Sequence, residues 1–135
     1  MDKKTAIQAQ PTMNTNESSE NYLEAILILS KSSAVVRSVD IATELKFKKS
    51  SVSVAMKKLR QSNHIMVSPQ GHITLTESGR DIATRIYERH NLLSSWLTEL
   101  GVTPEVAVED ACRIEHVLST ESFEAIKKHI ERTKA

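Results

Sequence analysis

Residues 38–75 carry the pattern that most restricts the fold of this chain. Two short amphipathic segments, 38–45 and 51–59, follow serines that can cap helices, and a tight turn separates them. Two β-favouring runs, 65–67 and 73–75, then flank Pro-Gln-Gly, which suits a hairpin turn. Two helices joined by a tight turn and followed by a hairpin are typical of a winged helix-turn-helix.

The two short helices also have predicted inner faces. Ser38 is expected to cap the first helix, and Ser50 or Ser51 the second. The apolar positions expected to point inward are Val39, Ile41, Ala42 and Leu45 in the first helix and Val52, Ala55, Met56 and Leu59 in the second.

The remaining ordered segments are predicted to be helical. Their expected ranges are 20–32, 77–100, 104–118 and 120–132. Thr76 can cap the longest helix, Gly101 can end it, and Thr103-Pro104 starts the next one. With only 3 Gly and 3 Pro in 135 residues, we predict a mainly α fold with a small β-hairpin wing.

Charge and composition divide the chain into regions. Residues 1–75 contain 10 Lys and Arg against 6 Asp and Glu, whereas residues 76–135 contain 8 against 11. We therefore expect two domains with different tasks, 18–75 and 76–135, after a disordered polar tail at 1–17. No apolar run is long enough for a membrane span and no hydrophobic signal core is present, so we expect a cytoplasmic protein without membrane contact.

A basic cluster surrounds the second helix of the helix-turn-helix. Between residues 46 and 60 there are six Lys and Arg and no Asp or Glu. A solvated face is the simplest reading of such a run, but this one lies where duplex backbone contacts are made. The expected DNA-contacting residues are Arg37, Lys46, Lys48, Lys49, Ser50, Ser51, Ser53, Val54, Lys57 and Lys58. Their short central side chains suggest weak direct base readout and more reliance on DNA shape.

The segment "DACRIEHVLS" contains the only cysteine of the chain. On a helix, Cys112, Glu115 and His116 would share one face, so a thiolate, a carboxylate and an imidazole could converge on a metal ion. The same spacing also fits an ordinary packed helix with a small buried cysteine. From these three residues alone, both interpretations stay open.

Several motifs together resemble the metal-dependent repressor family that includes the diphtheria toxin repressor and the manganese transport regulator. The resemblance covers about residues 20–132 and rests on "NYLEAI", "SVSVAMKKL" with "LTESG", "ERHNLL" and "ACRIEHVLS". It implies an N-terminal winged helix-turn-helix domain followed by an α-helical metal-binding and dimerisation domain. It also implies a homodimer that binds a double-stranded DNA operator.

The resemblance also implies a set of metal ligands. Asn21, Cys112, Glu115 and His116 match primary-site positions, whereas Glu24, His90 and Glu115 match positions that bind a second ion in manganese-type members. Glu115 would bridge the two ions. Asn21 departs from the family, in which Asp or Met is usual.

Other positions separate this chain from the longer iron-type members. Ser94 and Val108 replace a carboxylate and a histidine of their ancillary site, which we therefore expect to be absent. From a chain of 135 residues we expect the short, two-domain architecture, without the C-terminal SH3-like domain of the longer members. Cys112 matches the iron type, and thiolate softness leads us to expect Fe2+ first and Mn2+ next, with Zn2+ or Co2+ able to substitute.

We therefore expect a metal-dependent DNA-binding transcriptional regulator, a repressor of metal-uptake genes, in which an ion between the two domains orders the dimer. One alternative is a winged-helix regulator that senses oxidants through Cys112. A metallohydrolase that uses Glu115 as a base is disfavoured because nothing resembles an oxyanion hole or a substrate pocket. We expect no enzyme activity.

Overall fold

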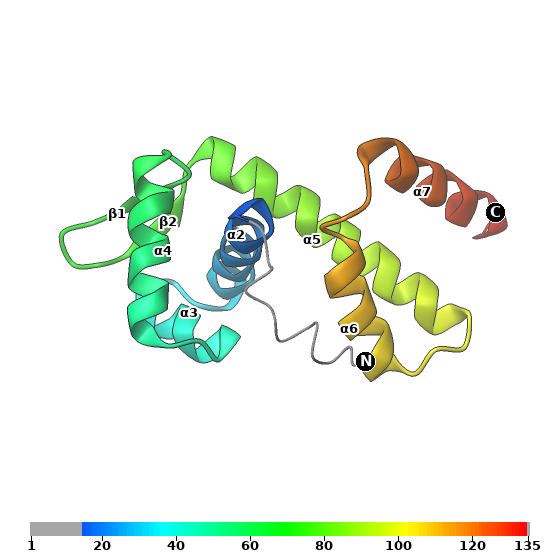
Figure 1. Ribbon diagram of the computed structural model, residues 1–135, viewed down its shortest axis with the longest axis horizontal. Coiled ribbons are helices and arrows are strands. Elements are labelled where there is room, and N and C mark those ends of the chain that lie inside the picture. Colours follow the sequence, from blue (N-terminus) through cyan, green and yellow to red (C-terminus); the bar gives the residue numbers. More distant parts are fainter. Residues whose placement is uncertain (1–14, 135) are drawn as a thin grey trace. The chain divides into compact units, whose positions relative to one another are not determined.

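The structure, a computed structural model, describes residues 15–134 and comprises helices and one hairpin (Figure 1). The elements are α2 (Thr15–Ser32), α3 (Ser38–Leu45), α4 (Lys49–Gln61), β1 (Ile65–Val67), β2 (Ile73–Leu75), α5 (Glu77–Glu99), α6 (Pro104–Ile114) and α7 (Thr120–Lys134). The described residues form two compact units, one that ends at Ala83 and one that begins at Thr84, so that their boundary lies within α5.

Helix α2 begins five residues earlier than expected. Residues 15–17 of the predicted tail form its first turn, where Glu17 interacts favourably with the helix dipole. Residues 1–14 of that tail lie outside the described residues.

The helix-turn-helix is present as α3 and α4, but serine does not cap either helix. Arg37 precedes α3, and its backbone N–H donates to Oδ2 of Asp40 at 2.9 Å, which is half of a capping box. Helix α4 begins at Lys49, so Ser50 and Ser51 lie inside its first turn. Lys46 ends α3 in a left-handed conformation with φ 60°.

The core of the first unit joins α2 to α3, α4 and the hairpin. Five of the apolar side chains that were predicted to point inward from α3 and α4 are buried: Ile41, Ala42, Val52, Met56 and Leu59. Leu23 and Ile26 of α2 are also fully buried. Val39 was predicted to point inward but is 45% exposed, because the short α3 buries only the face that contains Ile41 and Ala42.

The hairpin has the predicted bounds. β1 and β2 are antiparallel, with Val67 opposite Ile73, and Ile65 and Ile73 point into the core. Gly71 has φ 84°, a conformation that favours glycine in the tip of the turn. The guanidinium of Arg37 lies 2.9 Å from Nε2 of His72, which connects the start of α3 to the wing.

A tight junction links the hairpin to α5. Oγ1 of Thr76 accepts from the N–H of Gly79 at 3.2 Å, which confirms Thr76 as the N-cap, and donates to the carbonyl of Asn63 at 2.8 Å. A Cβ on Gly79 would overlap the carbonyl oxygen of His64. Glycine is therefore required here by close backbone approach.

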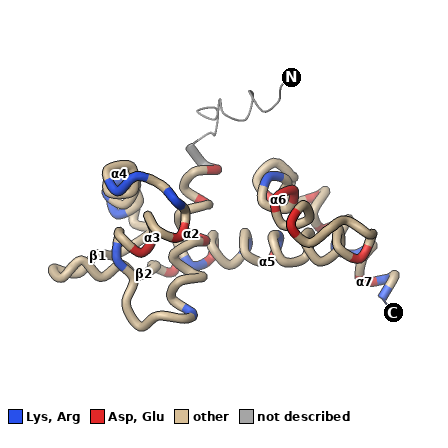
Figure 2. Tube along the Cα trace, turned by 90° about the horizontal axis from the view of Figure 1, so that it is seen from below, with Lys and Arg blue, Asp and Glu red and all other residues tan. Residues whose placement is uncertain are grey.

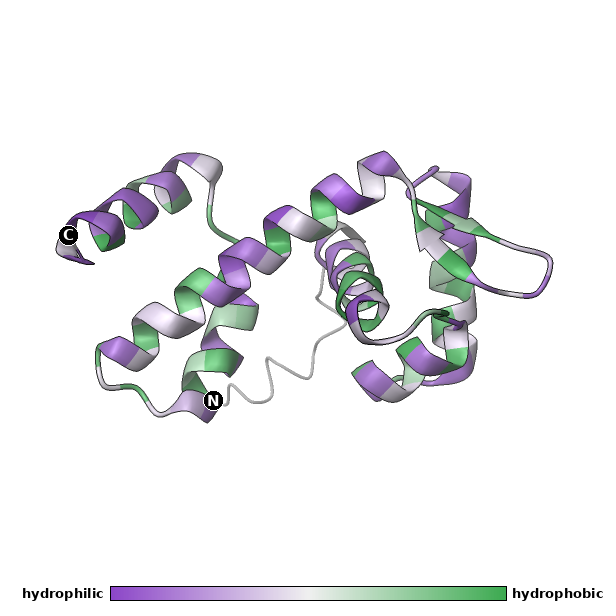
Figure 3. Cartoon of the chain, turned by 180° about the vertical axis from the view of Figure 1, so that it is seen from behind, coloured by the Kyte–Doolittle hydropathy of each residue, from purple (hydrophilic) through white to green (hydrophobic). Residues whose placement is uncertain are grey.

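The second unit packs α6 and α7 against the C-terminal part of α5. Leu93, Ala111 and Phe123 form its buried core, with Leu92, Trp96, Ile114, Leu118 and Ile126 packed around them. Figure 3 shows the apolar positions of α7 interrupting an otherwise hydrophilic helix. Leu100 is 64% exposed, and Gly101, with φ 108°, follows it at the end of α5.

Candidate metal centre and nucleic-acid interface

A buried carboxylate lies at the centre of a small polar cluster in the second unit. Glu115 is fully buried, and its Oε1 lies 3.2 Å from Nδ1 of His90 on α5. Its Oε2 lies 3.3 Å from Nε2 of His116, whose side chain is 1% exposed. The imidazole of His90, which is 25 positions earlier in the sequence, and that of the adjacent His116 thus lie beside one carboxylate.

One oxygen of this carboxylate has incomplete bonding. Within the described residues, Oε2 of Glu115 has no hydrogen-bond partner, since His116 is near it without the geometry of a hydrogen bond. Burial raises the pKa of Glu115, but the adjacent imidazoles of His116 and His90 together lower it below its ordinary value. The carboxylate is therefore ionised at neutral pH.

The donor set fits a divalent transition metal. Imidazole nitrogens and carboxylate oxygens are ligands for ions such as Fe2+, Mn2+ and Zn2+. A buried anion with an unsatisfied oxygen is costly unless a cation or a donor completes its bonding. The fit of these residues to a metal ion thus rests on the orphaned Oε2 of Glu115 and on the two imidazoles beside it.

Arg89 holds the turn that carries two of these groups. Its Nη1 donates to the carbonyl of Glu115 at 3.0 Å and to the carbonyl of Leu118 at 2.9 Å. Its guanidinium also lies over the ring of Phe123, 5.0 Å from the centroid. Arg89 is only 6% exposed. The sequence did not predict this burial, because α5 contains several charged residues and nothing in the local pattern distinguishes Arg89 from the exposed ones.

Helix α6 is shorter than predicted. It ends at Ile114 rather than near Leu118, so Glu115 and His116 lie in the following turn. The physical reason is that Arg89 donates a hydrogen bond to the carbonyl of Glu115. In a longer helix this carbonyl would accept a hydrogen bond from a backbone N–H of the next turn. Cys112, one turn earlier on α6, is exposed, so the three residues do not share one buried helix face.

The other predicted ligands belong to the first unit. Asn21 and Glu24 lie on α2, one turn apart, and Glu24 is 7% exposed. The two positions expected to lack ancillary ligands are occupied by uncharged residues: Ser94, whose hydroxyl donates to the carbonyl of Asn91, and Val108, which is 48% exposed.

The predicted DNA-contacting residues gather on and before α4. Figure 2 shows Lys and Arg concentrated on α4 and on the segment that leads into it. Ser50, Ser51, Ser53, Lys57 and Lys58 are exposed on this helix, and Val54 is 56% exposed. Lys46, Lys48 and Lys49 are exposed beside its start, whereas Arg37 lies at the start of α3 against His72.

The sequence matches two family descriptions. Residues 14–73 match "Iron dependent repressor, N-terminal DNA binding domain", and residues 76–135 match "Iron dependent repressor, metal binding and dimerisation domain". An HTH-type transcriptional regulator of Methanocaldococcus jannaschii is 35% identical over 121 residues, which cover 88% of this chain and 97% of the relative. The chain belongs to the iron-dependent repressor family.

Other members of the family are similar in sequence and fold. The regulator MntR of Listeria monocytogenes is 36% identical over 109 residues, covering 81% of this chain and 77% of MntR. The crystal structure of T. acidophilum IdeR has a TM-score of 0.69 and 28% identity over 86% of this chain. A manganese-dependent transcriptional repressor in complex with manganese has a TM-score of 0.77 and 27% identity over 84% of this chain. This chain spans about half the length of these two solved chains, 54% and 52%.

Membership defines the class of function. The protein is a metal-dependent, DNA-binding transcriptional regulator with a winged helix-turn-helix domain and a metal-binding and dimerisation domain. This family is not an enzyme class. The comparisons give no support to the alternative of a Cys112-based redox sensor. Among the residues that the structure describes, no helix has the length and apolarity of a membrane span.

Proposed function

We propose that this iron-dependent repressor family member holds a divalent metal through Asn21, Glu24, His90, Cys112, Glu115 and His116 and then binds a DNA operator as a homodimer. The observation that carries the proposal is the buried carboxylate of Glu115 between two imidazoles, with Oε2 unsatisfied. A bound ion would supply the positive charge that this anion lacks.

The protein residues have distinct tasks in this proposal. Glu115 provides an ionised oxygen, and His90 and His116 provide neutral imidazole nitrogens. Arg89 fixes the turn on which Glu115 and His116 lie. Because Asn21 and Glu24 belong to α2, ligation by them would tie the DNA-binding unit to the helical unit and restrict the position of α4.

For the metal we propose Fe2+ first and Mn2+ second, with Zn2+ or Co2+ able to substitute. The thiolate of Cys112 would favour a softer ion than Mn2+, whereas carboxylate and imidazole suit all of them. A similar structure contains manganese, and this supports Mn2+ as the alternative. Replacement of Cys112 by Ser should therefore weaken Fe2+ or Zn2+ binding more than Mn2+ binding.

On the DNA side, we propose that α4 enters the major groove. Lys57 and Lys58, with Lys46, Lys48, Lys49 and Arg37, would contact phosphates, and Ser50, Ser51, Ser53 and Val54 would lie nearest the bases. A symmetric dimer would contact two half-sites about 34–36 Å apart. The regulated genes would include those for metal uptake, and the protein would act in the cytoplasm as their repressor.

A comparison of two matched variants tests the metal site. Glu115→Gln removes the anionic ligand, whereas Glu109→Gln makes the same change at an exposed position of α6. A duplex is first selected from a random library by protein loaded with Mn2+ or Fe2+, and apo and loaded affinities are then measured.

The expected result is metal-dependent DNA binding by wild type and Glu109→Gln, with the metal effect lost in Glu115→Gln. A coupling of about 1–3 kcal/mol corresponds to about 5- to 150-fold in DNA affinity. Equal DNA affinity of wild-type protein with and without each metal would refute the proposed function.

A further inference from the structure

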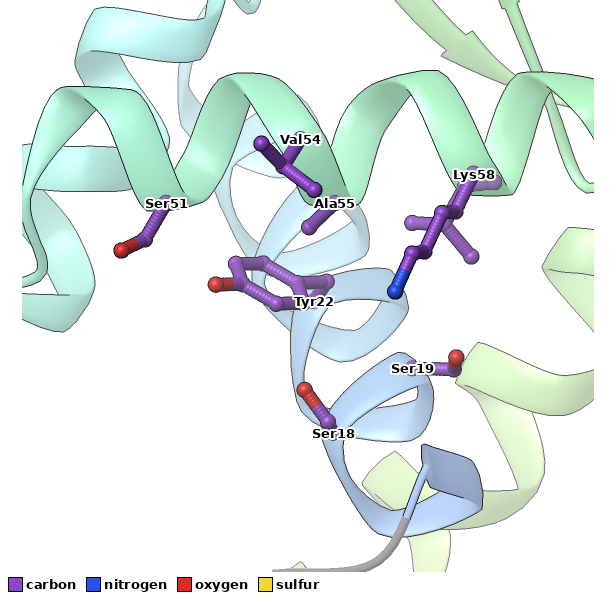
Figure 4. Close-up of a pocket in the computed structure, with 8 residues that line it drawn as sticks. Ser18, Ser19, Tyr22, Ser51, Val54, Ala55 and Lys58 are labelled. Atoms are coloured by element: carbon purple, nitrogen blue, oxygen red, sulfur yellow. The ribbon is translucent and has the colours of Figure 1, made fainter. Parts of the chain in front are cut away.

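One cation of the proposed DNA interface is held by a residue of the wing. Nη2 of Arg37, at the start of α3, lies 2.9 Å from Nε2 of His72, which is 35 positions later and directly precedes β2. Of the lysines and the arginine proposed to contact phosphates, only Arg37 has a side-chain hydrogen bond within the part of the chain that the structure describes. Lys58, by contrast, extends past the ring of Tyr22 into a pocket between α2 and α4 and makes no such bond (Figure 4).

The chemistry of this contact fixes the state of the imidazole. A guanidinium group has N–H donors and no acceptor, so Nε2 of His72 accepts, and the ring is neutral with its proton on Nδ1. A carboxylate partner would offset the charge of Arg37, whereas a neutral imidazole leaves that charge intact. Asp40 is near in sequence, but its Oδ2 accepts from the backbone N–H of Arg37 at 2.9 Å. The guanidinium is thus oriented without being neutralised.

His72 is itself held in the hairpin. Its N–H donates to Oγ of Ser68 at 3.1 Å, and its carbonyl accepts from the N–H of Ser68 at 2.9 Å. The N–H of Ile73 donates to the carbonyl of Val36 at 2.8 Å, which joins β2 to the residue before Arg37. Two neighbouring hydrogen bonds, one from the backbone and one from a side chain, therefore connect the wing to the start of α3.

We propose that His72 is a positioning residue for DNA binding, whose neutral imidazole holds the guanidinium of Arg37 ready for a phosphate. The proposal rests on the proposed function, in which Arg37 contacts the DNA backbone. One N–H donates to His72, and the other N–H groups of Arg37 stay available for phosphate oxygens. An arginine that is ordered before binding loses less conformational entropy when DNA binds, so the contact with His72 should raise affinity without touching DNA.

A double-mutant cycle on the duplex that metal-loaded protein selects tests this role. Arg37→Gln removes the cation and should lower DNA affinity about 10-fold, as for a charged hydrogen bond. His72→Leu removes only the acceptor and should lower affinity about 2- to 10-fold, the entropy of ordering one long side chain. In the Arg37→Gln background, His72→Leu should cause no further loss.

Two further variants separate positioning from a structural role. His72→Gln supplies an amide oxygen that can accept, so it should restore most of the affinity that leucine removes. His129→Leu makes the same change at an exposed histidine of α7 and should bind DNA like wild type. A leucine that only destabilised the fold would lower the melting temperature and would weaken Arg37→Gln as much as wild type, which would overturn the proposal.

A salt titration at pH 8 provides a second measurement. Arg37→Gln should lower the slope of log affinity against log salt by about 0.9 for each phosphate contact that is lost. His72→Leu removes no charge, because the imidazole that accepts from Arg37 is neutral, yet its slope should move toward that of Arg37→Gln. A slope equal to that of wild type, together with additive losses in the cycle, would mean that His72 does not act through Arg37.

Nitrogen NMR of the metal-free protein tests the contact without DNA. The ring of His72 should be the neutral tautomer with its proton on Nδ1, and the shift of Nε2 should change in Arg37→Gln. A proton on Nε2 would overturn the proposal, even if wild type binds DNA in a metal-dependent way. If the NMR result is as expected but wild type shows no metal-dependent selection of any duplex, the proposed function itself fails, which is a separate result.

Discussion

Replacement of Arg89 by Met removes the side chain that holds the turn between α6 and α7. Met is unbranched and of similar length, so it can keep part of the packing against Phe123. It cannot donate to the carbonyls of Glu115 and Leu118, which Arg89 contacts at 3.0 and 2.9 Å. The carbonyl of Glu115 would then lose a buried partner.

The contacts of Arg89 determine how much stability the substitution removes. Two hydrogen bonds from a charged donor contribute about 3–6 kcal/mol together, and the contact with Phe123 adds about 1 kcal/mol. Burial of the guanidinium, whose Nε has no partner among the described residues, offsets several kcal/mol of this sum. We expect a net loss of about 2–3 kcal/mol in the free energy of unfolding, and a loss of about 10-fold or more in metal affinity because the ligand turn is no longer held.

Urea unfolding of metal-free protein, followed by the fluorescence of the single tryptophan, measures the stability change in the second unit. Trp96 packs against the core of that unit. Arg113→Met is the matched control, since Arg113 is exposed and its pair with Asp110 is a surface contact at 3.4 Å. If Arg89→Met unfolds like Arg113→Met and binds Mn2+ as wild type does, Arg89 does not position the ligand turn.

Three further results are expected. Gly79→Ala should destabilise the first unit by about 1–3 kcal/mol in chemical denaturation, because its Cβ would overlap the carbonyl of His64; an unchanged midpoint would contradict this. Burial raises the pKa of Tyr22, so its folded phenol should ionise above pH 10.0 in an ultraviolet titration, with Tyr22→Phe assigning the signal. The folded state then keeps a proton that the unfolded state releases, so this contribution to stability is present below that pH and is lost as pH rises through the folded pKa. Metal affinity should fall as the pH is lowered into the acidic range, because imidazole ligands must be neutral; pH-independent calorimetric titrations would argue against ligation by histidine.

Local sequence patterns predicted the helix-turn-helix and the hairpin well. Ile65–Val67 and Ile73–Leu75 have the expected bounds, because alternating apolar residues and a Pro-Gln-Gly turn are local information. The predicted serine caps of α3 and α4 were wrong, whereas Thr76 and Thr103 are N-caps as predicted. Serine preference is a statistical tendency, and the hydrogen bond from the Arg37 backbone to Asp40 sets the start of α3 instead.

The candidate metal centre depended on contacts distant in sequence. The spacing of Glu115 and His116 marked them as possible ligands, and the resemblance to a known family added His90. Helical periodicity could not predict that α6 stops at Ile114, because the cause is an arginine 26 residues earlier that takes the carbonyl of Glu115. The burial of Arg89 and Glu115 is likewise a property of the packed unit rather than of any short segment.

A thermodynamic cycle tests whether the proposed metal ligands of α2 couple metal binding to DNA binding. If metal raises DNA affinity by a given factor, DNA must raise metal affinity by the same factor. If Glu24, which is 7% exposed on α2, transmits this effect as a ligand, Glu24→Gln should reduce the factor itself, with a larger loss of DNA affinity in the metal-loaded protein than in the apo protein. Four affinities, measured for apo and Mn2+-loaded wild type and Glu24→Gln on one duplex, give the answer. Equal losses in both states would mean that Glu24 contributes to DNA binding or folding without coupling it to the metal.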